Sequence, residues 1–378
     1  MKRILTIIIM MTTVLALFPA KKQTLEPSYA WKASAPLGLH VPATIDTLQY
    51  NYFREFIPSQ ISNAYATTGN FGAAGINSIY FEREERSDFL FDSNLKPWLY
   101  DAQDQVYYNT RIPMTLLSYN WGGGRDSGQD RLKGIFSGNA GKRIQVGALL
   151  DYLYSKGGYD HQAAKNFTWG LSGSYMGDRY EAQASFNSFN SVNHENGGIK
   201  DDLYIEDPAQ LQGGDPGINA KAIPVNLNEA FSRVKGAEFL MNHRYKVGYW
   251  HEEEINDTTV KRTYIPVTSF IWTFDYKKNS HVFVNKSASE DKEFFKNNYL
   301  SLDGSYDFSS YWRIRNTFGV DLLEGFNKYA KFGLSGFVIH EYRKYTQPTD
   351  SMLHYAEKPV DLTPIPEGIS VRQKESDN

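Results

Sequence analysis

Two glycine-rich stretches of the sequence have residue types that could cradle a phosphate. GGGRDSG at 122–128 has no Lys-Ser or Lys-Thr after its glycines and no strand-to-helix context, which a phosphate-binding loop requires. GNAGKR at 138–143 fails in the same way, because an arginine follows its lysine. A hairpin loop is the better interpretation of both stretches.

The acidic stretch HEEEIND at 251–257 places carboxylates beside His251 and could hold a cation such as Ca²⁺. Its spacing is not that of a known calcium loop, so a solvated acidic loop is favoured. The eight histidines are scattered without an H-E-x-x-H pattern, and the pair His243 and His251 is an unpersuasive ligand set. No G-x-S-x-G is present. We therefore predict no catalytic residues, no metal site, no cofactor and no enzymatic activity.

Composition narrows the class of protein further. The 378 residues suffice for two ordinary domains or one large all-β domain. The net charge of −3 favours neither nucleic acid nor an anionic surface as a partner, and the absence of cysteine excludes disulfides, thiolate metal sites and a cysteine nucleophile. Aromatic residues make up 15% of a chain whose mean hydropathy is only −0.50, which suggests that they are concentrated on one surface.

Alternating residues predict long antiparallel strands. In FTWGLSGSYMGDRYEAQASF at 167–186, large apolar residues alternate with small or polar ones on both sides of a Gly-Asp-Arg turn, the pattern of a β-hairpin. Helical periodicity is nowhere convincing. Ten candidate strands follow: 110–121, 131–138, 143–155, 166–176, 180–191, 237–250, 264–276, 299–308, 311–322 and 329–344.

The predicted connections alternate in length. Those at 139–142, 177–179 and 309–310 are short, and those at 122–130, 156–165, 192–236 and 277–298 are longer, while 251–263 is longer than this rule expects. A membrane β-barrel shows such alternation, with tight turns at one end and longer loops at the other. We therefore predict an all-β fold: an antiparallel up-and-down transmembrane β-barrel, possibly incomplete. The alternative is a soluble β-sandwich, which also alternates.

Three features favour the barrel over the sandwich. The strands are longer than the usual five or six residues (roughly ten to fifteen). The apolar face is rich in Tyr and Trp, whose polar tips suit a bilayer interface better than a closed core. The opposite face carries charges that suit a wet lumen. The predicted lumen-lining residues are Glu181, Arg244, Lys246, Asp303, Asp307, Arg313, Arg315 and Asp321.

Three residues do not fit this assignment of faces. His243 falls on the predicted lipid face, and Leu149 and Leu153 fall on the predicted lumen face. Either the register is wrong there, or these residues lie near strand ends. The polar segment ENGGIKDD at 195–202 either folds into the lumen or caps a surface loop.

The chain divides into four predicted parts. Residues 1–30 have two basic residues before an apolar run, as in a secretory signal peptide, with cleavage after Ala20 or Ala30. A single membrane anchor is the alternative. Residues 31–109 form an N-terminal extension of short strands and loops, residues 110–345 hold the barrel strands, and residues 346–378 form a polar tail without a strand pattern.

Several motifs occur together in the order in which a known family has them. They are IDTLQYNYFREFIPS, YNTRIPMTLLSYNWGGG, GYDHQAAKNF, GSYMGDRYEAQASF, NHENGGIKDDLYIEDP and NHRYKVGY. With them the chain, from about Pro36 to about Tyr345, resembles the Bacteroidetes-type putative porin family.

The resemblance implies an outer-membrane β-barrel through which small solutes diffuse. Outer-membrane lipid, small hydrophilic solutes and the barrel-insertion machinery are then the expected partners, with no nucleic acid and an undetermined oligomeric state. Members of that family are usually longer, and outer-membrane barrels commonly end in an aromatic residue, whereas this sequence ends SVRQKESDN. It is either a truncated member, which we favour, or a shorter variant. A non-conducting structural or adhesive envelope protein, or a non-functional porin fragment, is the alternative function.

A closed barrel resists cold detergent and unfolds on heating. We therefore expect the protein from an outer-membrane fraction to change its gel mobility between unboiled and boiled samples. Absence of the shift would indicate a chain that does not close.

Overall fold

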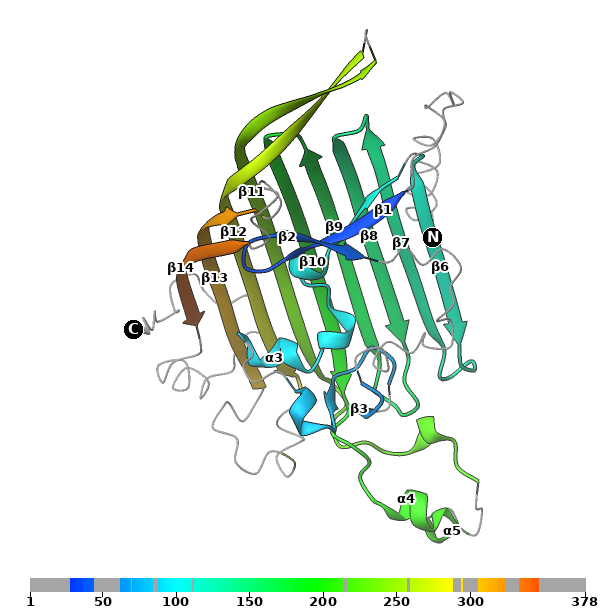
Figure 1. Cartoon of the computed structure of the whole chain (residues 1–378). Helices are drawn as coiled ribbons and strands as arrows, with labels where there is room; N and C mark the ends of the chain where they lie inside the picture. Colours follow the sequence, from blue (N-terminus) through cyan, green and yellow to red (C-terminus); the bar gives the residue numbers. More distant parts are fainter. Residues whose placement is uncertain are drawn as a thin grey trace.

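The computed structural model describes residues 28–43, 62–68, 70–83, 88–110, 112–211, 213, 217–256, 259–287, 294, 305–323 and 333–346. The predicted signal peptide lies outside these residues up to residue 27, and the predicted polar tail lies outside them after Thr346. Within them, one large antiparallel sheet carries an N-terminal segment on one of its faces (Figure 1).

The large sheet is an up-and-down meander, which confirms the predicted all-β antiparallel class. Each strand pairs with its neighbours in sequence, in the order β6 to β14, and every pair is antiparallel. Among the described residues the sheet is open, with β6 and β14 at its edges. The strands are β6 (Met114–Gly122), β7 (Gln129–Ala140), β8 (Ile144–Ser155), β9 (Ala164–Met176), β10 (Tyr180–Glu195), β11 (Ala230–Asn256), β12 (Thr259–Asn285), β13 (Ser305–Leu322) and β14 (Leu334–Thr346).

Short turns and long loops lie at opposite ends of the sheet. β7–β8, β9–β10 and β11–β12 are joined by residues 141–143, 177–179 and 257–258, all at the end that is uppermost in Figure 1. The connection between β10 and β11, residues 196–229, lies at the other end and includes α4 (Leu203–Glu206), α5 (Pro208–Leu211) and the 3-10 helix η5 (Ala220–Ala222). These short helices have no periodic pattern in the sequence that could have predicted them.

Two of the predicted connections were wrong. The turn at 309–310 does not exist, because β13 runs without interruption through Ser309 and Ser310, so that the candidate strands 299–308 and 311–322 do not form separate strands. Residues 251–263 are not a long loop either. β11 and β12 continue pairing almost to their turn and extend beyond the rest of the sheet (Figure 1). The alternation of apolar and polar residues is weak in this part of the sequence, because both faces of the β11–β12 hairpin carry polar residues.

The N-terminal segment, described at residues 28–43, 62–68, 70–83 and 88–110, consists of short elements that lie across one face of the sheet (Figure 1). β1 (Tyr29–Ser34) pairs with β2 (Leu39–Ala43) and with β5 (Val106–Asn109), and β3 (Tyr65–Thr67) pairs with β4 (Gly75–Asn77). Between them lie α3 (Leu90–Ser93) and the 3-10 helices η2 (Tyr80–Glu82), η3 (Lys96–Trp98) and η4 (Ala102–Asp104).

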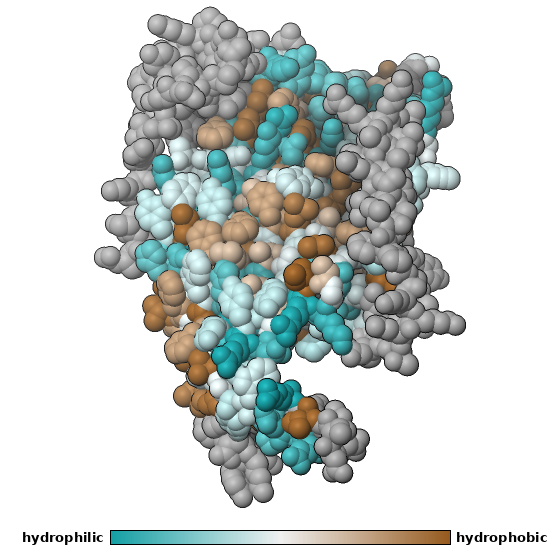
Figure 2. Space-filling model, turned by 90° about the horizontal axis from the view of Figure 1, so that it is seen from above, coloured by the Kyte–Doolittle hydropathy of each residue, from teal (hydrophilic) through white to brown (hydrophobic). Residues whose placement is uncertain are grey.

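Burial in the sheet is opposite to that of a soluble protein. Large apolar side chains of the uncovered face are exposed, for example Leu171 at 54% and Phe318 at 55%. The other face is polar and buried: Gln183 is 3% exposed and Asn242 is 3% exposed. Seen from the end of the short turns, hydrophobic and hydrophilic side chains occupy separate patches of the surface (Figure 2). We call these two sides the outer face and the polar face.

The residues that did not fit the predicted faces have a structural explanation. Leu149 and Leu153 do lie on the polar face, in register with Asp151, so the predicted register was right. Leu153 is 2% exposed and packs with Trp98 and Phe89 of the N-terminal segment in the main hydrophobic cluster. A leucine is therefore tolerated at position 153 of the polar face, because the N-terminal segment shields it from water. His243 does lie on the outer face, where it stacks on Trp272.

Shortening Leu153 should leave a cavity beneath the N-terminal segment. We expect Leu153→Ala to lower the free energy of unfolding by about 2–5 kcal/mol in detergent, the range for buried leucine. The matched variant Leu171→Ala shortens an exposed outer-face side chain and should cost much less. Equal losses in urea unfolding would mean that the segment does not pack on this face.

Candidate functional site: the polar face and its cover

Strand alternation assembles the polar face from many strands. Because side chains alternate between faces, residues two apart in β10 point the same way, and antiparallel register aligns them with β11 and β12. Gln183 thus lies opposite Asn242, which lies opposite Thr273. Asn242 Nδ2 donates to Thr273 Oγ1 over 2.6 Å. The result is a continuous hydrogen-bonded surface and not a row of isolated groups.

The turn after β1 fits against this surface through neutral hydrogen bonds. Gln183 Nε2 donates to the Gly38 carbonyl over 3.1 Å, and Asn242 Nδ2 donates to the Leu37 carbonyl over 3.2 Å. Gly38 has φ +65°, and a Cβ there would lie 2.5 Å from Asn242. Only glycine meets both requirements. His40 hydrogen-bonds Gln183 over 3.0 Å, and burial holds the pKa of its imidazole below the usual value despite Glu181 nearby.

Next to this turn, η4 and the residues before it contact buried charges. The Ala102 amide donates to Glu238 Oε2 over 2.6 Å. The Tyr100 hydroxyl donates to Asp151 over 2.8 Å, and Arg131 holds the same carboxylate over 2.6 Å. Backbone and tyrosine donors from the segment therefore give these buried carboxylates further partners, in addition to Arg131 of the sheet at Asp151.

Farther along the sheet, three aspartates of the segment meet cations of the sheet. Asp101 lies 3.4 Å from Lys277, while Asp92 lies 3.9 Å from the same ammonium group. Asp88 pairs with Arg313 and lies 3.4 Å from Arg343. A polar cavity of about 250 Å³ lies beside these contacts, with Lys96, Glu238 and Arg315 also in its lining.

All described members of the predicted lumen-lining set lie on the polar face or at its ends. Two ion pairs join members of the set across strands: Glu181 with Lys246, and Arg244 with Asp321 over 3.4 Å. A third pairs Arg313 with Asp275, which is outside the predicted set, over 2.6 Å.

The remaining members of the set are more peripheral. Arg315 pairs with Glu341 of the edge strand β14, and Asp307 is half-buried near the start of β13. Asp303 lies outside the described residues. That these side chains line a path for solute stays a prediction.

Sequence reasoning missed about half of this charge network. Asp275 could have been found, since it alternates with Phe274 and Tyr276 in the predicted strand 264–276. Lys277 continues this alternation but was assigned to the predicted connection 277–298, whereas β12 runs on to Asn285. The segment aspartates could not, because no local pattern distinguishes them from the solvated charges around them. The prediction of a wet interior did not include a cover, whereas the N-terminal segment lies over much of the polar face.

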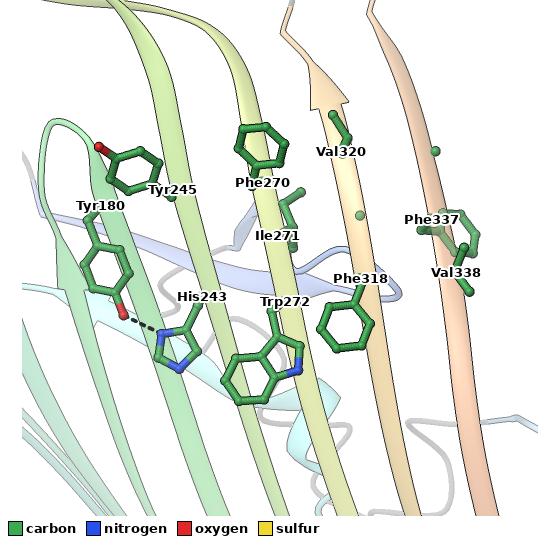
Figure 3. A pocket seen from close by; sticks show the side chains of 12 residues that line it. Tyr180, His243, Tyr245, Phe270, Ile271, Trp272, Phe318, Val320, Phe337 and Val338 are labelled. Carbon is green, nitrogen blue, oxygen red and sulfur yellow. Dashed lines mark hydrogen bonds between the residues drawn. The ribbon is translucent and has the colours of Figure 1, made fainter.

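The outer face carries an apolar groove of about 540 Å³ across β11 to β14 (Figure 3). Exposed rings of Phe270, Trp272 and Phe318 project from it on one side. At the end near the β9–β10 turn, the Tyr180 hydroxyl shares a hydrogen bond with His243 Nδ1. The one histidine of this groove thus has both a hydrogen-bond partner and an aromatic neighbour, which explains how it fits an apolar face.

The remaining sequence motifs lie outside these surfaces. Residues 195–202 begin the long connection beyond the strand ends and do not fold over the polar face, which rules out the lumen alternative for the described part (Figure 1). In the acidic stretch, Glu252 pairs with Arg262 across the β11–β12 hairpin. GGGRDSG forms the β6–β7 hairpin loop, as predicted.

The two faces define a class of protein: an antiparallel β-sheet wall whose aromatic side is exposed and whose charged side is internally paired. None of the helices in the described ranges is long and apolar enough to cross a membrane. A family described as putative porin matches residues 28–377. The chain belongs to this family, which confirms the resemblance and supports a porin-like, non-enzymatic role. No curated protein and no solved structure matches the chain.

The segment contact should depend on pH through Asp101. Burial raises the pKa of this carboxyl, but Lys277 and Lys96 lower it by more, so that it lies below the usual value. A lowered folded-state pKa stabilises the contact above the unfolded pKa of about 3.9 and loses this effect as pH falls through the folded value.

We therefore expect tryptophan fluorescence to report release of the segment more steeply below about pH 4 in the wild type than in Asp101→Asn. Trp98, which is buried in the segment, is the reporter. Identical acid profiles of the two proteins would show that Asp101 does not contribute.

Proposed function

We propose that the protein is an outer-membrane channel through which small hydrophilic solutes diffuse passively along the polar face. The observation that carries this proposal is the inverted burial: aromatic side chains are exposed on the outer face, and ionised side chains are paired on the polar face. In a bilayer the outer face gains lipid contact, while the polar face remains the only side fit for water and solute.

This function requires export and insertion, so the proposed partners are outer-membrane lipid and the barrel-insertion machinery. The aromatic outer face supports contact with lipid, since Trp and Tyr are enriched where membrane proteins meet the bilayer interface. Among the described residues, Tyr245, Trp272 and Trp250 are exposed on the sheet. Small hydrophilic solutes are the proposed cargo, and no reaction is proposed.

The charges of the polar face support weak ion selectivity. Arg244 and Arg313 each face a carboxylate of the sheet, as does Lys246, so neither sign is left in excess along the strands. Selectivity in a narrow aqueous path follows the unpaired charge that its lining presents.

A second function is favoured by a different observation. The N-terminal segment fills the space against the polar face, with hydrogen bonds to β9, β10 and β11. If the segment covers the polar face permanently, the protein does not conduct solutes and is a structural or adhesive envelope protein.

Step conductance in a planar bilayer separates the two functions. Recordings at about 1 M KCl, where the Debye length is about 3 Å, screen the surface charges and favour any opening. We expect discrete conductance steps and, in a KCl gradient, a reversal potential close to zero. No steps under these conditions would overturn the channel proposal, and a strong cation or anion preference would contradict the charge balance.

A further inference from the structure

The N-terminal segment is held on the polar face in two different ways. Toward β7 to β10 it is held by packing, as at Leu153, and by hydrogen bonds to the neutral Gln183 and to the Asp151 carboxylate. Toward β12 to β14 it is held by ion pairs that join Asp88, Asp92 and Asp101 of the segment to Lys277, Arg313 and Arg343 of the sheet. We call these six residues the latch.

Two aspartates of the latch are partly exposed to water. Asp88 and Asp101 are 25% and 24% exposed, and both line the polar cavity of about 250 Å³. Dissolved ions can therefore reach these two carboxylates, whereas in the pair of Arg313 with Asp275 both side chains are buried, at 5% and 4% exposed. Ion pairs in contact with water are weak individually and are screened by salt.

Release of the segment would leave few charges without a partner. Arg313 keeps Asp275, and Arg343 keeps Glu341, because both carboxylates belong to the sheet. On the segment, Asp101 keeps Lys96 at 2.7 Å. Within the described part of the chain, Lys277 pairs with two carboxylates of the segment, Asp92 and Asp101, and Glu238 of β11 lies in the same cavity lining. Removing one partner of a buried pair is costly when nothing replaces it, and here each arginine has a replacement.

From these contacts we propose that the N-terminal segment is a detachable closure, and that the latch holds it shut over the polar face. Release opens the solute path and exposes a wall on which Arg313 and Arg343 keep carboxylate partners of the sheet. Whether release admits solute rests on the proposed channel function, whereas the latch itself does not.

The test removes the latch carboxylates without changing side-chain shape. Asp88→Asn/Asp101→Asn is compared with the wild type and with Asp178→Asn, which removes an exposed pair with Arg143 at the β9–β10 turn. Two measurements are made in proteoliposomes and bilayers: the rate of chymotryptic cleavage after Trp98, which is buried in the closed segment, and the conductance at low and at high salt.

We expect cleavage and low-salt open probability to rise roughly tenfold in the double variant, as the loss of two partly exposed pairs would produce. High salt should bring the wild type close to the double variant. Asp178→Asn should match the wild type throughout.

Variants of Lys277 test directly whether Lys277 and Asp101 act as one ion pair. Lys277→Met should also speed cleavage, and adding it to Asp101→Asn should have little further effect, because both changes remove the same pair. Full additivity would show that the two side chains act independently.

A cross-link supplies the complementary test, since the natural chain has no cysteine. Ser185 Oγ lies 3.4 Å from the Ala102 carbonyl oxygen, so Ala102→Cys/Ser185→Cys can be joined by a short thiol-reactive reagent. Joining them in the Asp88→Asn/Asp101→Asn background should restore slow cleavage and abolish the added conductance.

The outcomes separate this inference from the proposed function. Equal cleavage in the wild type and the double variant, or the same increase in Asp178→Asn, overturns the latch. If conductance rises in the cross-linked double variant, the N-terminal segment is not what closes the path. Faster cleavage in the double variant with no current in any protein supports the latch and overturns the channel.

Discussion

The structure depends on one constraint: a sheet with an exposed apolar face must satisfy its polar groups on the other side. Charged and amide side chains buried without partners cost several kcal/mol each, so the polar face is viable only if it pairs internally or remains wet. The chain uses internal pairing, with cross-strand ion pairs such as Arg313 with Asp275. The N-terminal segment then supplies donors and acceptors to groups that the strands leave over, as Ala102 does for Glu238.

This division of labour explains why residues with no common sequence pattern meet at the polar face. Gly38 presents its carbonyl to Gln183, and Tyr100 presents its hydroxyl to Asp151. Both are backbone or side-chain groups from irregular stretches, which can follow a curved surface more closely than a regular helix could. Irregular structure in the segment is therefore a requirement of the surface that it covers.

The sheet was largely predictable from the sequence because its signal is local. Alternation in residues 143–155 and 166–191 predicts the strands and their faces correctly, including the polar-face position of Leu153. Prediction failed where that signal is absent. The serines at 309 and 310 read as a turn although their pairing with β12 continues, and polar residues on both faces hide the ends of β11 and β12. The contacts of Asp88 or Asp101 join residues more than a hundred positions apart, so no local pattern could predict them.

The number of strands in the sheet fixes the relative direction of its two edges. In an up-and-down meander each strand reverses its predecessor, so β6 and β14, the first and the ninth, run the same way. If these two edges met directly, they would form a parallel ladder with slanted hydrogen bonds, unlike every other pair in the sheet. An antiparallel seam needs an odd number of intervening strands. Whether the number of strands is odd or even thus determines whether the strand pair that closes the sheet is parallel or antiparallel.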